Sequence, residues 1–183
     1  MINLPIRVVL GLGGLLFIIQ AAWMPAKAQL GQHLLERNWQ QIQAGNIPGS
    51  PWPGADIQPV AQLEVPSLDI SQLVVNGQQG NNLAWAPGLV SAGLPGKSDT
   101  VISAHRDSHF RFLRNLHTGD QLQLTTSNEN FTYKVVSMEI IDSNLSQLEL
   151  SSDDQRLILT TCYPFDALQT GGPLRYVVTA VAI

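Results

Sequence analysis

Three residues of this chain have types and positions suited to covalent chemistry on a carbonyl group. Cys162 is the only cysteine in the 183 residues and ends a β-patterned run, RLILTTC. His105 directly follows a second such run, TVISA, and Arg175 stands near the start of a third, LRYVVTAVAI. Three further arginines lie near or in such runs: Arg106, Arg111 and Arg156. A thiolate attacks carbonyl carbon, an imidazole moves protons, and a guanidinium donates hydrogen bonds to an oxyanion. The sequence therefore favours Cys162 as a nucleophile.

Other interpretations of these residues stay open at this level. A free cysteine can simply pack as a small apolar side chain, although an unpaired thiol is a liability in an exported protein unless it is used. His109 and His117 are the other histidines of this region, but they lie in more helical or turn-like sequence. His105 is better placed, because strand ends are where rigid scaffolds tend to mount catalytic groups.

A zinc site built from His105, His109 and Cys162 is a further alternative. The i, i+4 spacing of the histidines needs a continuous helix, which a strand ending at His105 argues against, and no acid stands in the general-base position. We therefore expect no metal and no cofactor. Acidic residues stand among serine and asparagine farther along the chain, and we expect them to form solvated turns rather than a calcium site: Asp142, Glu149, Asp153 and Asp154.

The composition suits an all-β protein. The chain is 44% hydrophobic and only 13% charged, with 15 Gly and 11 Pro, which favours short strands and turns over a helical bundle. The formal net charge of -4 gives no electrostatic footprint for nucleic acid, so we exclude that partner.

Eight short β-patterned runs follow one another from Val60 to the end of the chain. They have no long helical stretch between them, which predicts a closed or nearly closed β-barrel with largely antiparallel pairing. Residues His109 to Leu116 are expected to form one short helix. The runs are VAQLEV, QLVVNG, LAWAPG, TVISAH, DQLQLTT, FTYKVVSMEIID, RLILTTC and LRYVVTAVAI.

An apolar run from Val8 to Met24, interrupted only by Gln20, predicts a membrane-spanning helix about 26 Å long. Trp23 is placed as an interfacial anchor, and Arg7 on the N-terminal side predicts an inside amino terminus and an outside catalytic domain. A cleavable signal peptide is the alternative, because residues 26–28 form an A-x-A site. The long apolar run and the single basic residue before it favour a retained anchor.

The segment after this run predicts a stalk and a linker. Residues 27–44 have helical spacing of Leu30, Leu34 and Leu35, and Gly45 is a C-terminal signal. The stretch GNIPGSPWPGADIQP is too rich in Pro and Gly for regular structure. We therefore divide the chain into an anchor (1–28), a stalk helix and linker (29–59) and a catalytic barrel (60–183).

Three motifs, SAHRDSHFRFLRNLHTGDQLQL, LILTTCYPF and GGPLRYVV, resemble the sortases in their order along the chain. The resemblance covers nearly the whole chain and is strongest to the Gram-negative or marine proteobacterial type, with its close kin in class D. It implies a sortase-like closed eight-stranded β-barrel with few short helices. It assigns Cys162 as nucleophile, His105 as general acid and base, and Arg175 as stabiliser of the oxyanion and substrate.

The chain departs from the family pattern at three positions. Ile158 stands where the cysteine motif usually begins with Thr, Ala104 stands where Gly often precedes the histidine, and Leu89 replaces a histidine commonly seen after the PG of the WAPG segment. None of these departures removes a catalytic group. They bear on loop geometry and on the fit of the substrate.

The resemblance implies a membrane-anchored cysteine transpeptidase. Such an enzyme cleaves a C-terminal LPxTG-like sorting signal through a cysteine thioester and transfers the protein to an amine. Its catalytic domain would lie on the periplasmic or extracytoplasmic side of the inner membrane, held by a single-pass helix. Residues expected to contribute to an apolar substrate groove are Thr161, Tyr163, Phe165 and Trp85. A cysteine endopeptidase or hydrolase with the same three residues, and a membrane-tethered binding barrel without catalysis, remain the alternatives.

Overall fold

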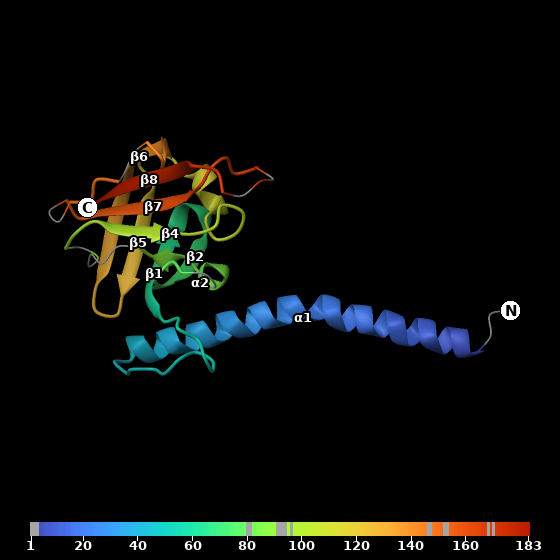
Figure 1. Ribbon diagram of the computed structural model, residues 1–183. Helices are drawn as coiled ribbons and strands as arrows, with labels where there is room; N and C mark the ends of the chain where they lie inside the picture. The colour runs from blue at the N-terminus through green and yellow to red at the C-terminus, as the bar shows by residue number, and fades with distance from the viewer. Residues whose placement is uncertain are drawn as a thin grey trace.

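Eight strands close into one barrel, and a long N-terminal helix lies against it (Figure 1). The computed structural model describes residues 4–79, 82–90, 95, 97–145, 148–151, 154–167, 169 and 171–183, with the backbone alone for residues 4–11. In the described residues the strands follow the order β1-β2-β3-β4-β7-β8-β6-β5 around the barrel. The closed eight-stranded barrel predicted from the sequence is confirmed.

The strand pairing is mostly antiparallel, as predicted. Parallel pairing occurs between β2 and β3 and between β4 and β7, and the other neighbours run antiparallel. The strands are β1 (Pro59–Val65), β2 (Ile70–Asn76), β3 (Gly88–Leu89), β4 (Thr100–Ser103), β5 (Gln121–Thr126), β6 (Asn130–Asp142), β7 (Arg156–Cys162) and β8 (Leu174–Ala182).

Side-chain alternation along β7 decides which residues face outward. Leu157 and Leu159 belong to the main core inside the barrel, whereas Ile158 packs with Val101 and Val177 in a separate small cluster. Because successive side chains of a strand point to opposite faces, Thr160 and Cys162 share the outer face with Ile158. The nucleophile predicted from the sequence therefore projects from the barrel wall rather than into its core.

Helix α1 runs without interruption from Leu4 to Gln43 and includes Pro25. The sequence predicted an anchor and a separate stalk helix, and the structure corrects this to one continuous helix. It ends as predicted at Gly45, whose φ of 79° lies in the left-handed region. Gly45 N–H donates to the Ile42 carbonyl (2.9 Å) and Asn46 N–H to the Gln41 carbonyl (2.9 Å), which is a Schellman cap.

The two halves of α1 have different surroundings. In the second half, Leu35 and Trp39 pack with Ile57 and Val75 against the barrel. The first half runs away from the barrel (Figure 1), and its apolar side chains, such as the 75% exposed Phe17, face solvent. Within the described residues, no helix combines the length and apolar character that a membrane crossing needs, so the structure does not support the predicted membrane-spanning segment.

One of the shorter helices corrects a strand predicted from the sequence. The run LAWAPG, predicted as a strand, instead forms helix α2 (Asn82–Trp85), followed by the two-residue strand β3. The amide of Asn82 holds this turn by donating to the carbonyls of Asp56 (3.2 Å) and Asn76 (3.3 Å). The short 3₁₀ helices are η1 (Pro66–Leu68) and η2 (Arg111–Asn115), and η2 confirms the short helix predicted in this region.

A buried ion pair joins the beginnings of β4 and β7. The Asp99 carboxylate accepts hydrogen bonds from the Arg156 backbone N–H (3.0 Å), Nε (3.0 Å) and Nη2 (2.5 Å). The hydrogen bond from Arg156 lowers the pKa of the Asp99 carboxyl from its usual 3.8 to about 2, although burial opposes this effect. The carboxylate is thus charged throughout the neutral range.

We predict that Asp99→Asn lowers the free energy of unfolding by about 2 kcal/mol near pH 7. Because the folded-state pKa of Asp99 is lowered, the stability it contributes is fully present above about pH 4 and is lost as the pH falls towards 2. Urea unfolding at a series of pH values should therefore show the two proteins converging in acid. Asp166→Asn is the control, because it removes a surface ion pair with Arg114. A pH-independent difference would contradict the prediction.

Candidate active site

Cys162 and Arg175 are direct cross-strand partners. The antiparallel register of β7 and β8 places Cys162 opposite Arg175, so both side chains rise from the same face of the sheet. The Arg175 guanidinium is held close to its strand, because its Nη1 donates to the carbonyls of Gly172 (2.6 Å) and Leu174 (2.9 Å). Both residues are half-buried. The sheet therefore places a permanently charged side chain and the thiol on the wall of the same cavity.

His105 reaches the same place through the parallel pairing of β4 and β7. Ser103 pairs with Thr160, so two further residues along each strand bring His105 to the level of Cys162. The ladder continues past the end of β4, because Ala104 N–H donates to the Thr160 carbonyl (3.3 Å). The His105 side chain is exposed at this strand end.

One cavity of about 450 Å³ contains all three residues. Its walls come from the ends of β4, β7 and β8, the segment before α2, and the region between β6 and β7. The structure thus brings together Cys162, His105 and Arg175. The other lining residues are Gln78, Leu83, Ser103, Ala104, Ile141, Ser143, Leu148, Thr160 and Thr161.

His109 lies near His105 but differs from it in environment. Burial lowers the pKa of His109, a hydrogen bond to the backbone of Ala84 opposes this, and the electrostatic interaction with His105 lowers it further. A chain of turns joins the two histidines, with Phe110 N–H bonded to the His105 carbonyl (3.0 Å). The continuous helix that a His105–His109 metal site needs is therefore not formed. Of these two, only His105 lines the cavity with Cys162.

The expected groove residues take different positions. Thr161 lines the cavity, but it is buried and its hydroxyl donates to the Ala104 carbonyl (2.7 Å), so it fastens β7 to the end of β4. Tyr163 and Phe165 form an aromatic cluster with Tyr176, with ring centroids 5.2 to 6.2 Å apart. This cluster follows Cys162 in the chain but does not line the cavity.

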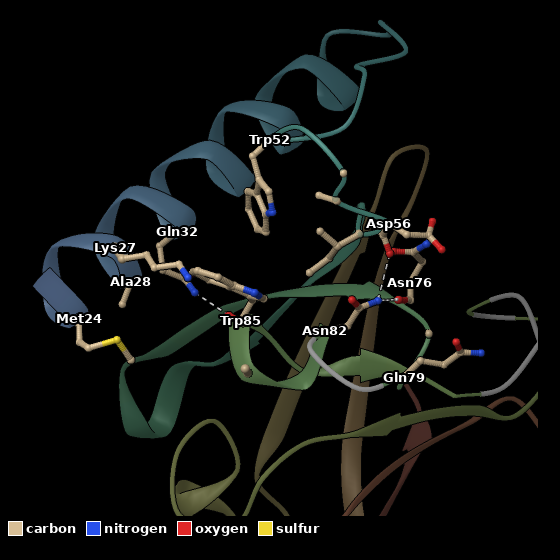
Figure 2. A pocket seen from close by; sticks show the side chains of 15 residues that line it. Met24, Lys27, Ala28, Gln32, Trp52, Asp56, Asn76, Gln79, Asn82 and Trp85 are labelled. Carbon is tan, nitrogen blue, oxygen red and sulfur yellow. Dashed lines mark hydrogen bonds between the residues drawn. The ribbon is translucent and has the colours of Figure 1, made fainter.

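Trp85 lies elsewhere, which corrects its predicted place in the groove. Figure 2 shows it with Trp52 on the wall of a larger cavity, about 1060 Å³, between α1 and the barrel. The two rings are 4.9 Å apart, and Gln32 of α1 donates to the Trp85 carbonyl (2.5 Å). A Cβ at Gly31 would collide with the Trp85 ring. Trp85 therefore packs against α1 and not around Cys162.

Arg106, one of the four candidate arginines, supports the site in a way that the sequence reasoning did not anticipate. It directly follows His105, yet it is only 8% exposed. Its Nη2 donates to the carbonyls of Ala167 (2.8 Å) and Gln169 (2.7 Å), in the loop that leads from Cys162 to Arg175. Arg106 thus ties the histidine strand end to this loop. Its position beside His105 was the only signal in the sequence, and burial cannot be read from it.

We predict that Arg106→Ala lowers the free energy of unfolding by about 2 to 4 kcal/mol, because it removes a buried side chain together with its two charge-assisted hydrogen bonds to the loop. Urea unfolding measures the effect. Arg111→Ala is the matched control, since Arg111 lies on the same segment but is exposed. Equal destabilisation by the two changes would show that the hydrogen bonds from Arg106 to the loop add nothing specific to the free energy of unfolding.

Comparison with known proteins identifies the fold and the family. The family model of the sortase domain matches residues 63–183, which is most of the chain. The chain belongs to the sortase family. Sortases are cysteine transpeptidases, and the resemblance seen in the sequence is confirmed.

Named relatives agree with this membership. The chain is 35% identical to Sortase D of Bacillus subtilis over 119 residues, which are 63% of this chain and 60% of the relative. It is 30% identical to Sortase A of Listeria monocytogenes over 108 residues, 56% and 49% of the two chains. The chain thus spans about half to 60% of the length of these curated sortases.

A solved sortase shares the fold. The barrel and helix resemble the Sortase D5 transpeptidase of Clostridium perfringens with a TM-score of 0.65, over 85% of this chain and 99% of that one, at 18% identity. The likeness to class D sortases agrees with the kinship expected from the sequence. The Gram-negative or marine proteobacterial type is not shown by these comparisons and stays a prediction.

Proposed function

We propose that this sortase is a cysteine transpeptidase that cuts an LPxTG-like sorting signal and joins the released protein to an amine. The observation that carries the proposal is the convergence of Cys162, His105 and Arg175 on one cavity. Three different strand ends supply these groups, and each group has a chemical role that the others cannot fill. Membership of the sortase family supports the same chemistry.

The reaction balances with these residues alone. The Cys162 thiolate attacks the carbonyl carbon of the scissile bond, and Arg175 donates hydrogen bonds to the oxyanion that forms. The oxyanion collapses to a thioester as the C–N bond breaks, and imidazolium His105 gives its proton to the departing amine. An incoming amine then attacks the thioester, loses a proton to His105 and releases the Cys162 thiolate.

Transfer rather than hydrolysis is favoured by the apolar part of the cavity. Leu83, Ile141 and Leu148 line it beside the thiol. Apolar walls restrict access of water to a bound thioester, and a positioned amine then competes better for the acyl group. Hydrolysis by the same three residues is the second candidate function, and it differs only in the group that resolves the thioester.

We predict that Cys162→Ala abolishes the acyl-enzyme, because no other thiol exists in the chain. His105→Ala and Arg175→Ala should each lower turnover by about 100-fold or more, the usual cost of removing a general acid or an oxyanion donor. Mass spectrometry of an LPxTG-like peptide incubated with diglycine reports the products. Peptide joined to diglycine supports transfer, and free acid alone supports hydrolysis.

His109→Ala is the matched control for this experiment. His109 lies near His105 but does not line the cavity, so its replacement should leave most of the turnover. A larger loss with His109→Ala than with His105→Ala would overturn the assignment of the histidine. Full acyl transfer by Cys162→Ala would overturn the mechanism.

We also propose that the catalytic barrel works outside the cytoplasm and that the first half of α1 associates with a membrane. Support comes from the exposed apolar side chains of this half, among them Leu16 and Ile18, which have no partner on the barrel. The charge pattern around the run favours an outside barrel.

A chain without residues 1–28 should consequently remain folded, active and free of the membrane fraction, whereas the full chain sediments with membranes. Centrifugation of cell lysates followed by the peptide assay measures both properties. Recovery of the full chain in the supernatant would contradict the membrane association. An insoluble shortened chain would show instead that this part of α1 is needed by the barrel.

A further inference from the structure

A short segment between β6 and β7, residues 148–151, does not pair with a neighbouring strand. These residues form neither helix nor strand, yet Ser151 is bound through two hydrogen bonds to Asp99, the residue before β4. Ser151 N–H donates to the Asp99 carboxylate (2.8 Å), and Asp99 N–H donates to the Ser151 carbonyl (3.1 Å). Asp99 is only 3% exposed, so the residue that anchors Ser151 is itself buried in the protein.

Arg156 adds a second attachment to the same segment. Its guanidinium donates hydrogen bonds to the Asp99 carboxylate, and its Nη2 also donates to the Glu149 carbonyl (3.0 Å). Asp154 is the other charged group near it, with its carboxylate 3.7 Å from Nη2 at the surface. Glu149 and Ser151 are therefore both tied to one buried ion pair, which we call the Asp99–Arg156 clamp.

The clamped segment forms a wall of the catalytic cavity. Leu148, which precedes Glu149, lines the cavity that contains Cys162. It also lines a second hollow of about 460 Å³ on the outer face of β6, β7 and β8, together with Glu149 and Arg156. Leu148 thus stands between two hollows. Asp99 lines neither of them, and its hydrogen bonds to Ser151 connect it to the segment that carries Leu148.

We propose that the Asp99–Arg156 clamp sets the position of Leu148 against the bound peptide, so that Asp99 and Arg156 are positioning residues for substrate binding. This inference rests on the proposed transpeptidase function. It assigns the two residues no contact with the reacting atoms. An extended peptide that passes Cys162 meets Leu148 at the edge of the cavity, and that contact is lost when the segment moves.

The clamp can be tested by separating substrate binding from chemistry. Asp99→Asn should raise KM for an LPxTG-like peptide by about tenfold while kcat changes by less than about threefold, because binding to the wall is lost and the catalytic residues stay in place. Leu148→Ala should reproduce the rise in KM without touching the clamp. Arg156→Lys keeps the charge but not the forked geometry, so its KM should lie between the KM of the wild-type protein and the KM of Asp99→Asn.

Two readouts distinguish positioning from a general structural role. Alkylation of Cys162 by iodoacetamide should proceed at the wild-type rate in Asp99→Asn, since the small reagent does not need the wall. Amide hydrogen exchange of residues 148–151 should quicken in Asp99→Asn, while that of β7 should not. Asp154→Asn is the matched control, since Asp154 is exposed and its carboxylate lies 3.7 Å from Arg156 Nη2 at the surface, and it should change neither KM nor exchange.

The outcomes are separable. Unchanged KM in Asp99→Asn or in Leu148→Ala overturns the positioning role, as does a loss confined to kcat. If Asp99→Asn does not fold, Arg156→Lys and Leu148→Ala decide the question by the same KM criterion. Absence of turnover in the wild-type protein overturns the proposed function instead. In that case unchanged exchange at residues 148–151 in Arg156→Lys would overturn the clamp independently.

Discussion

The site depends on the register of β7 between its two neighbours. One neighbour, β8, runs antiparallel and sets Arg175 opposite Cys162, while the other, β4, runs parallel and brings His105 to the same level. A shift of one residue in β7 would turn Cys162 into the core and Thr161 out. The inner face prevents this shift, because Leu157 and Leu159 are fully buried in the barrel. Core packing on one face of β7 thus fixes the chemistry on the other.

Much of this arrangement could be predicted from short-range patterns. Alternating or apolar runs bounded by turn residues predicted the strands of the barrel, and the lone thiol at the end of RLILTTC indicated the nucleophile that we propose. The family motifs then selected His105 and Arg175. These residues lie at strand ends, where the period of a strand fixes the side-chain direction. That the three share one cavity depends on pairing between distant strands, which local patterns do not contain.

The parts that could not be predicted depend on long-range partners. LAWAPG has the composition of a strand, but contacts of Trp85 with α1 and of Asn82 with two backbone carbonyls make it a helical turn. Arg106 and Asp99 are charged residues in polar sequence, where exposure is the usual expectation. Their burial depends on partners that are distant in the sequence: two loop carbonyls bind Arg106, and the Arg156 guanidinium binds Asp99.

Closure of the barrel has a consequence for recognition. Every strand of the described barrel has a neighbour on both sides, and only limited stretches, such as the part of β2 beyond its two-residue pairing with β3, lack a strand partner on one side. An extended peptide therefore finds little edge to join as a further strand, the mode in which main-chain hydrogen bonds supply the affinity. Affinity for a peptide has to come from its side chains and from the loops that enclose them. Such a surface recognises the side chains of a particular motif rather than the backbone of any extended peptide.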